Sequence, residues 1–275
     1  MAYMLNCQNK CICFLSDMSN SYEALVKKCF SGELSVERVN QIIDKVFELL
    51  NAGEIRVAEK IGNNWIVNQW VKEAILLAFK IKPATRQNFD CYDKLGLLPY
   101  DYDNPRYRKV PFAMIREGVY IGDNAVVMPS YINVGAYVGE KTMIDINATI
   151  GSCAQIGKNC HIAASAVIGG VLEPASARPV IIEDHCFIGV HSSVLEGVIV
   201  EENSVVASGV SISASTKIID RETGEIRYGV VPSGSVVVPG TYPSKNGINI
   251  SCAVIVKQID AKTRSKTGIN ELLRE

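Results

Sequence analysis

The sequence lacks an excess of charge of either sign. Its 28 lysines and arginines stand against 29 aspartates and glutamates, which gives a formal net charge of -1. Proteins that bind nucleic acid or anionic membranes rely on an excess of positive charge. We therefore expect small molecules, and neither nucleic acid nor a membrane, as the main partners.

Long apolar runs are missing as well. No segment approaches the roughly 20 apolar residues that a membrane-spanning helix needs, and the first residues lack the apolar stretch of a secretory signal. We expect a protein that is neither secreted nor embedded in a membrane, and we place it in the cytoplasm. The hydrophobic fraction of 48% is ample for a buried core.

No Cys-x-x-Cys pair occurs among the nine cysteines, which are mostly scattered singly through apolar segments. That distribution is typical of reduced thiols in a cytoplasmic protein. Cys7, Cys11 and Cys13 form the one cluster, but no second pair matches it, so we predict no metal site there.

The first part of the chain, residues 1–105, is expected to be a small α-rich domain. The residues before about Asn20 show no recognisable pattern, and we expect a frayed terminus. Residues 99–105 contain two prolines among turn-forming residues, which predicts the link to the next domain.

Two helices are predicted within this domain. Apolar residues recur at helical spacing between Ser35, a suitable N-cap, and Gly53, and the same pattern returns over residues 68–81. Between these helices, alternating residues around Gly62 predict a β-hairpin.

From residue 126 on, aliphatic side chains recur at every sixth position. They are Val126, Ile132, Val138, Ile144, Ile150, Ile156, Ile162 and Ile168, then, after an interruption at residues 170–181, Ile182, Ile188, Val194, Val200, Val206 and Ile212. Four positions after most of them stands a small or thiol-sized side chain. A period of six fits neither a helix nor a lone strand.

This pattern is the hexapeptide repeat of a parallel β-helix. Each hexad supplies a short strand and a turn, three hexads close a triangular coil of about 18 residues, and the aliphatic residue points into the shaft. We predict a mostly β protein with the β-helix over residues 106–240. The helices of the first domain can cover one end, and residues 241–275 form a C-terminal tail and cap with a strand, a basic loop and a short helix.

Several stretches are more specific than the hexads, and together they resemble one family. They are RVAEKIGNNWIVNQWVKEAILLAFKI, VVMPSYINVGAYVGEKTMIDINATIGSCAQIGKN, IGGVLEP, DRETGEIRYGVVPSGSVVVPG and CAVIVKQIDAKTRSKTGINELLR. From about Gly53 to the C-terminus the chain is similar to the 2,3,4,5-tetrahydropyridine-2,6-dicarboxylate (tetrahydrodipicolinate) N-succinyltransferases. The resemblance implies a left-handed β-helix, an exception to the usual right-handed crossover, assembled as a homotrimer with active sites between chains.

The resemblance also implies a reaction. The succinyl group of succinyl-CoA passes to tetrahydrodipicolinate, which gives N-succinyl-2-amino-6-oxopimelate and CoA in the diaminopimelate route to lysine. Succinyl-CoA is a cosubstrate, and no tightly bound cofactor is expected. The attacking nitrogen must lose a proton, which a positioned carboxylate can accept, while backbone amides can stabilise the oxyanion.

Asp145 is the predicted catalytic residue. It follows Ile144 at a position where the other hexads usually have glycine or alanine, so its side chain can leave the shaft without disturbing the core. It matches an aspartate that the family assigns to the substrate site. The alternative is an aspartate that bonds the amides of its own turn.

Two arginines are candidates for binding the carboxylates of the substrate, because a guanidinium can hold a carboxylate with two hydrogen bonds. Arg108 matches the family's substrate-binding arginine, and Arg116 is a second candidate. For both, the alternative is an arginine stem packed on the first coil.

The CoA candidates are of two kinds. An extended pantetheine could lie beside the small residues Ala207, Ser208 and Gly209, and positive charge for the phosphates is concentrated in the tail at Lys257, Lys262, Arg264 and Lys266. A solvated charged surface is the alternative for the tail.

The chain departs from the family at one point. The family pattern reads Arg-Ser-Glu-Val-Val-Glu-Gly, whereas residues 191–197 read His-Ser-Ser-Val-Leu-Glu-Gly. Ser193 replaces an acid implicated near the reacting centre, so either that acid is of minor importance, or Glu196 or another acid serves, or rate or substrate preference is changed. Counting hexads puts Asp145 and Ser193 on one face, two coils and roughly 16 Å apart, so a neighbouring chain would have to supply one side of the site.

Other functions remain open on the residues alone. Another hexapeptide acyltransferase or a non-enzymatic solenoid would show the same hexads. Zinc held between chains is a further possibility, but His161, His185 and His191 do not align between coils, since His185 is expected over Asn159 and His191 over Ser165.

Overall fold

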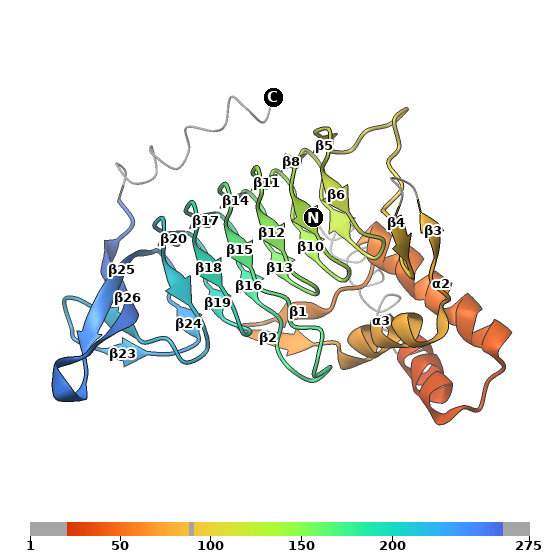
Figure 1. Cartoon of the computed structure of the whole chain (residues 1–275), viewed down its shortest axis with the longest axis horizontal. Coiled ribbons are helices and arrows are strands. Elements are labelled where there is room, and N and C mark those ends of the chain that lie inside the picture. The colour runs from red at the N-terminus through yellow and green to blue at the C-terminus, as the bar shows by residue number, and fades with distance from the viewer. Residues whose placement is uncertain (1–20, 88–90, 261–275) are drawn as a thin grey trace, which may run out of the picture.

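The computed structural model describes residues 21–87 and 91–260. A triangular prism of short parallel strands makes up most of it, with helices beside the prism and an antiparallel hairpin beyond its far end (Figure 1). The three parallel sheets are typical of a left-handed β-helix. The predicted fold class is therefore confirmed.

Each face of the prism is one sheet, to which successive coils add one strand each. Face 1 contains β5 (Arg108–Lys109), β8 (Val126–Val127), β11 (Met143–Ile144), β14 (His161–Ile162), β17 (Phe187–Ile188) and β20 (Val205–Val206). Face 2 contains β6 (Met114–Ile115), β9 (Tyr131–Ile132), β12 (Thr149–Ile150), β15 (Val167–Ile168), β18 (Ser193–Val194) and β21 (Ser211–Ile212). Face 3 contains β7 (Tyr120–Ile121), β10 (Tyr137–Val138), β13 (Gln155–Ile156), β16 (Ile181–Ile182), β19 (Ile199–Val200) and β24 (Val230–Val231). We call the turns from face 1 to face 2 the first corner, those from face 2 to face 3 the second, and those from face 3 to face 1 the third.

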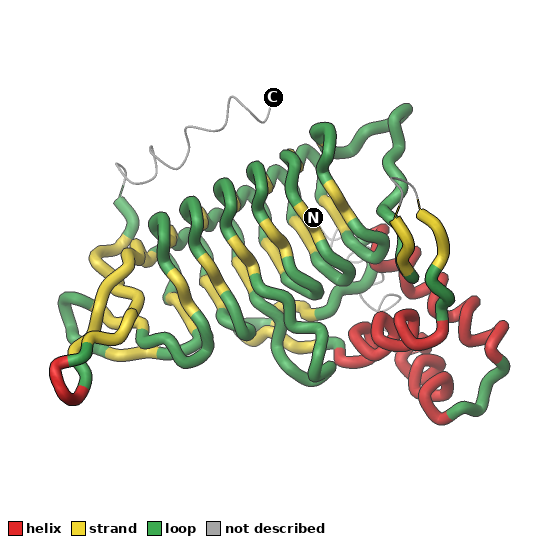
Figure 2. The backbone as a smooth tube through the Cα atoms, in the orientation of Figure 1, coloured by secondary structure: helices red, strands yellow, loops and turns green. Residues whose placement is uncertain are grey.

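The shaft of the prism is filled by aliphatic side chains that stack from coil to coil. Ile144 pairs with Ile162, which pairs with Ile188, and all three are buried. Burying each such side chain contributes about 1.5–3 kcal/mol. Figure 2 shows how strand and turn alternate along the prism. The predicted inward positions from Ile132 to Ile212 are confirmed, because all of them are buried in the shaft.

The first predicted hexad is wrong by one residue. Val127, and not Val126, pairs with Ile144 and lies in the shaft, while Val126 pairs with the outward Met143. The cause is the turn after β8, which contains Pro129 and has one residue fewer than the turn after β11.

The small residues four positions after the inward aliphatic residues form hydrogen bonds between coils. Several of them donate hydrogen bonds to carbonyls of the next coil. Thr142 Oγ1 donates to the carbonyl of Gly157 at 2.8 Å, and Ser192 Oγ donates to that of Ala207 at 2.7 Å. These bonds satisfy carbonyls that the turns leave without a strand partner.

The predicted helices are present. Residues 21–31 are helical, and α2 (Val36–Ala52) begins after Ser35, whose side chain accepts a hydrogen bond from the amide of Arg38. Gly53 ends α2 in the left-handed conformation, with φ 72°. The second predicted helix is α3 (Gln69–Ile81).

The hairpin predicted around Gly62 is also confirmed, as β1 (Ala58–Ile61) paired with β2 (Asn64–Val67). It packs against face 3 and not on the end of the prism, because Trp65 Nε1 and Lys60 Nζ each lie 2.7 Å from Glu183 Oε1. A second short hairpin, β3 (Thr85–Gln87) with β4 (Cys91–Asp93), follows α3.

The helices do not close the end of the prism by themselves. Their apolar core extends to Val134 and Cys153 at the second corner, so they pack along the side of the coils. The end of the shaft is covered by Tyr107 together with Leu98 and Tyr100 from the link between the two regions.

Beyond the last coils the chain forms β22 (Ile218–Asp220), β23 (Ile226–Arg227) and a long antiparallel pair, β25 (Ser235–Pro243) with β26 (Asn249–Gln258), joined through the 3-10 turn η2 (Lys245–Gly247). The strands predicted here are confirmed. The predicted basic loop and short helix fall on residues 261–275, and the predicted frayed terminus on residues 1–20, both outside the described residues.

Candidate active site

Asp145 lies at the first corner, directly after β11. Because the pairing runs from Ile144 through Ile162 and Ile188 to Val206, the residues after these four form one column along the corner. The column consists of Asp145, Ala163, Gly189 and Ala207. An acidic side chain is thus followed along the prism by a strip of small residues.

The space for a side chain at a corner differs from coil to coil. At the third corner a Cβ on Gly139 would lie 2.5 Å from the carbonyl carbon of Gly157, so no side chain fits there. In the column of Asp145 the preceding coil carries Met128, since Val127 pairs with Ile144. Further along the column of Asp145, a Cβ on Gly189 would likewise lie 2.5 Å from the amide nitrogen of Ser208. The space for a side chain therefore belongs to the coil of Asp145 and not to the first corner as a whole.

Both carboxylate oxygens of Asp145 have a hydrogen-bond contact. Oδ1 accepts a hydrogen bond from the backbone amide of Ile146 at 2.7 Å, and Oδ2 lies 3.3 Å from Nε2 of His161. The side chain keeps 24% of its surface exposed. The carboxylate is thus oriented and still accessible to a small molecule.

His161 was considered in the sequence only as a possible metal ligand, so its contact with Asp145 is new. One coil has 18 residues, so Ala163 lies directly beside Asp145 in the next coil. His161 is two residues before Ala163 and is therefore the diagonal neighbour of Asp145. Knowledge of the coil length was the signal that could have predicted the pair.

Arg108 lies on the same face as Asp145. The pairing of β5 with β8 and of β8 with β11 aligns Arg108, Val126 and Met143 in one outward row. Arg108 is exposed, and two strand spacings, about 10 Å, separate its backbone from that of Met143.

Arg116 lies elsewhere. It follows β6 at the second corner, where Nη2 is 2.6 Å from Asp93 Oδ2 and Nη1 donates to Asn133 Oδ1 at 3.2 Å. Its guanidinium also lies over the ring of Phe79. These contacts tie the helical region to the first coils, and the residue is remote from the corner of Asp145.

The expectation that Asp145 and Ser193 share a face is wrong. Ser193 belongs to β18 and pairs with Val167 on face 2, whereas Asp145 follows a strand of face 1. β18 is the seventh strand after β11, which is two coils of three strands and one further step around a corner. The count of two whole coils was therefore one hexad short.

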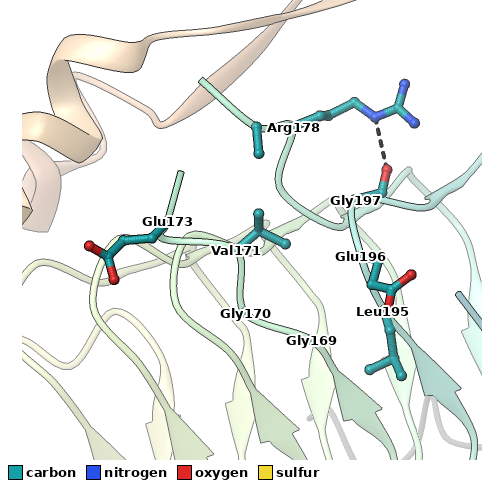
Figure 3. A pocket seen from close by; sticks show the side chains of 9 residues that line it. Gly169, Gly170, Val171, Glu173, Arg178, Leu195, Glu196 and Gly197 are labelled. Atoms are coloured by element: carbon teal, nitrogen blue, oxygen red, sulfur yellow. Dashed lines mark hydrogen bonds between the residues drawn. The ribbon is translucent and has the colours of Figure 1, made fainter. Parts of the chain in front are cut away.

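Glu196 lies at the second corner beyond Ser193. Its Oε2 accepts a hydrogen bond from the amide of Ala214 at 3.1 Å. It borders a pocket of ≈ 600 Å³ between the end of β18 and the segment that interrupts the hexads (Figure 3). The lining residues are Gly169, Gly170, Val171, Glu173, Ala177, Arg178, Leu195, Glu196 and Gly197.

Two hydrogen bonds hold the outer wall of this pocket in place. Arg178 Nε donates to the carbonyl of Gly197 at 2.8 Å, as Figure 3 shows. On the other side, Lys72 of α3, which is fully buried, donates from Nζ to the carbonyl of Ala177 at 2.6 Å. Burial lowers the pKa of the Lys72 amine.

The predicted CoA residues are only partly described. Ala207, Ser208 and Gly209 form the first-corner turn after β20, where Ser208 and Gly209 are exposed. Lys257 lies in β26, with Nζ 2.6 Å from Asp260 Oδ2. Lys262, Arg264 and Lys266 fall outside the described residues.

Within residues 21–87 and 91–260, no group of three or more His, Cys, Asp and Glu side chains is arranged to hold a metal ion. The cluster of Cys7, Cys11 and Cys13 lies outside this part of the chain. No helix in the described ranges has the length and apolarity needed to cross a membrane.

Comparison with known proteins identifies the family. Residues 23–81 match the model for the N-terminal region of tetrahydrodipicolinate N-succinyltransferase. Residues 135–170 match the bacterial transferase hexapeptide, and residues 179–214 match the hexapeptide repeat of succinyl-transferase.

Two relatives that match most of the chain are named for this N-succinyltransferase activity. The 2,3,4,5-tetrahydropyridine-2,6-dicarboxylate N-succinyltransferase of Sodalis glossinidius is 54% identical over 243 residues, which cover 84% of this chain and 88% of the relative. That of Polynucleobacter asymbioticus is 51% identical over 276 residues, covering 94% and 100%. A crystal structure of a 2,3,4,5-tetrahydropyridine-2-carboxylate N-succinyltransferase from Campylobacter jejuni has a TM-score of 0.52 at 17% identity, covers 85% of this chain and 64% of that one, and shows a shared fold. The chain therefore belongs to the 2,3,4,5-tetrahydropyridine-2,6-dicarboxylate N-succinyltransferase family and is an N-succinyltransferase of diaminopimelate and lysine biosynthesis.

Proposed function

We propose that this chain moves the succinyl group of succinyl-CoA to tetrahydrodipicolinate with Asp145 as the general base. The observation that carries the proposal is the carboxylate of Asp145, which is held by the Ile146 amide and keeps 24% of its surface exposed. In the coils that follow, the same corner carries small residues. A fixed, accessible carboxylate is what general-base catalysis requires.

The reaction assigns a task to each group. The ring nitrogen of the hydrated cyclic substrate attacks the thioester carbonyl, and Asp145 accepts the proton that the nitrogen loses. The tetrahedral oxyanion is stabilised by backbone amides. Its collapse breaks the C–S bond and releases CoA, and the ring opens when the C–N bond at the hydrated carbon breaks to leave a ketone.

Arg108 is the proposed partner of a substrate carboxylate. Its backbone lies about 10 Å from that of Met143, beside Asp145 on the same face. The long arginine side chain can cover part of that distance, so one carboxylate can be bound while the ring nitrogen reaches Asp145. The ion pair of Arg116 with Asp93 supports no such role for that residue.

CoA is proposed to run along the first corner. Ala163, Gly189 and Ala207 continue the column of Asp145, and such small residues leave space for an extended pantetheine beside the coils. Ser208 and Gly209 are exposed at the end of this strip. Positive charge for the phosphates would come from Lys257, Lys262 and Arg264 in the tail.

We further propose a homotrimer, located in the cytoplasm, with its active sites between chains. Thr149, at the end of the turn that begins with Asp145, pairs with Val167, which pairs with Ser193. Ser193 is thus two strand spacings, about 10 Å, from the coil of Asp145, too far for both to contact one small substrate within a chain. A second chain would supply the face 2 side. Light scattering that showed a fully active monomer would exclude this assembly.

The experiment that tests the function is a thiol-release assay with a panel of acyl-CoAs and acceptors. We expect CoA release only when succinyl-CoA and tetrahydrodipicolinate are both present. Release with acetyl-CoA and a serine or amino-sugar acceptor would favour another hexapeptide acyltransferase, and no release with any pair would favour a non-enzymatic solenoid.

A further inference from the structure

Asp145 is held by a residue that no sequence motif singles out. One oxygen, Oδ1, is occupied by the Ile146 amide at 2.7 Å, and the other, Oδ2, lies 3.3 Å from Nε2 of His161. A carboxylate has about four lone-pair sites, so these two contacts fix its plane and leave other sites for a proton from the substrate.

The position of His161 in the coil explains why the contact forms. Met143 pairs with His161 across neighbouring strands of face 1, so outward side chains on β14 lie next to Asp145, which follows β11. His161 is 6% exposed, and its ring meets Phe187 of the next coil edge to face at 5.2 Å between ring centroids. The imidazole is therefore held by packing as well as by the carboxylate.

We propose that His161 is a positioning residue for Asp145: its Nε2–H group donates to Oδ2 and keeps the carboxylate aimed at the substrate nitrogen. The inference rests on the proposed function, in which Asp145 is the base. No covalent step is required of His161. It holds the acceptor, and Asp145 takes the proton.

The structure separates this role from two others. No three potential ligands gather around His161 within the described residues, which argues against a metal site. A purely structural residue would contribute packing against Phe187, and phenylalanine at position 161 could supply that packing without the hydrogen bond. The comparison of phenylalanine with a donor of similar reach therefore distinguishes the two roles.

The first test measures steady-state kinetics of three variants. Misplacement of a catalytic group by about 1 Å can cost about 100-fold, so we expect His161→Phe to lower kcat by about 10- to 100-fold with both KM values nearly unchanged. His161→Gln, whose side-chain amide can still donate to Oδ2, should recover most of the loss. His185→Asn, at an exposed third-corner position with φ 60°, is the matched control and should keep wild-type kinetics.

The second test is a double-mutant cycle with Asp145→Asn, which stays informative even if His161→Phe lowers stability. If His161 acts through Asp145, adding His161→Phe to Asp145→Asn should reduce kcat by no more than about 2-fold. Multiplicative losses, or a Gln variant as impaired as the Phe variant, would overturn the proposal.

The outcomes also separate this inference from the proposed function. If Asp145→Asn loses turnover but His161→Phe does not, the positioning role alone is refuted. If Asp145→Asn keeps turnover, the assignment of the base is refuted and the positioning role is refuted with it.

Discussion

Lys72 of α3 donates a hydrogen bond from its buried Nζ to the carbonyl of Ala177, 105 residues further along the chain. This bond joins the helical region to the segment that interrupts the hexads and lines the pocket beside Glu196. Because the amine has no exposed surface, its charge is costly to bury, and its pKa is lowered for that reason.

We predict that Lys72→Met leaves the melting temperature equal to or above that of the wild type. An apolar side chain of similar length removes the cost of burying the charged amine. The pKa of Lys72 is lower in the folded than in the unfolded state, so this cost is present at neutral pH and is relieved only as the pH rises. The lost bond should instead loosen residues 171–180, seen as faster amide hydrogen exchange in that segment.

Lys80→Met, on the exposed side of the same helix, is the control and should change neither the melting temperature nor the exchange rate. Exchange in residues 171–180 of the Lys72 variant that is as slow as in the wild type would contradict the role of the bond.

A second prediction concerns the acid sensitivity of the hairpin on face 3. Burial raises the pKa of Glu183, but bonds from Lys60, Trp65 and the Glu202 amide outweigh this and lower it overall. A lowered folded-state pKa gives stability that is present above the ordinary glutamate pKa and is lost as the pH falls through the folded-state value.

Glu183→Gln should therefore destabilise the protein at pH 7 by about 1–2 kcal/mol, allowing for the exposure of Lys60, and the difference should shrink as the pH falls below the ordinary pKa of a glutamate. Thermal melts of both proteins across this pH range check the prediction. A constant difference between them at all pH values would show that Glu183 acts through shape and not through its charge.

Arg108→Ala should raise KM for the cyclic diacid far more than KM for succinyl-CoA. A charge-assisted contact with a carboxylate contributes on the order of 1.5–3 kcal/mol, or about 10- to 100-fold in binding. Arg106→Ala, two residues earlier, removes an exposed arginine and is the matched control. Equal effects of Arg108→Ala on both substrates would indicate a structural residue.

The replaced acid at Ser193 gives a fourth prediction. Ser193 is half-buried in β18 on face 2, whereas the Glu196 carboxylate accepts a hydrogen bond from the Ala214 amide at the second corner. We expect Ser193→Glu to raise kcat or shift its pH profile and Glu196→Gln to be nearly neutral. The reverse pattern would mean that Glu196 has taken over the role of the missing acid.

The sequence alone predicted the coil, its inward residues from Ile132 on, and the residues Ser35 and Gly53 that cap α2, because each depends on local spacing. Ser193 was expected on the face of Asp145 because the seven strand steps from β11 to β18 were counted as two whole coils of three. The shorter turn at Pro129 was missed because Val126 fits the period of six although Val127 is the inward residue. The coil length of 18 residues makes His161 a diagonal neighbour of Asp145, but the spacing does not show that the two side chains make contact, which the three-dimensional structure supplies.

The most direct test of the account is the turnover of Asp145→Asn. Asparagine keeps the shape of the side chain and can still accept the hydrogen bond from the Ile146 amide, so assembly and CoA binding should be unchanged, with Asp123→Asn at an exposed corner as the control. If Asp145 is the base, kcat should fall by roughly 100-fold or more. Near-wild-type turnover would show that Asp145 only forms its turn, and would contradict the assignment of the active site.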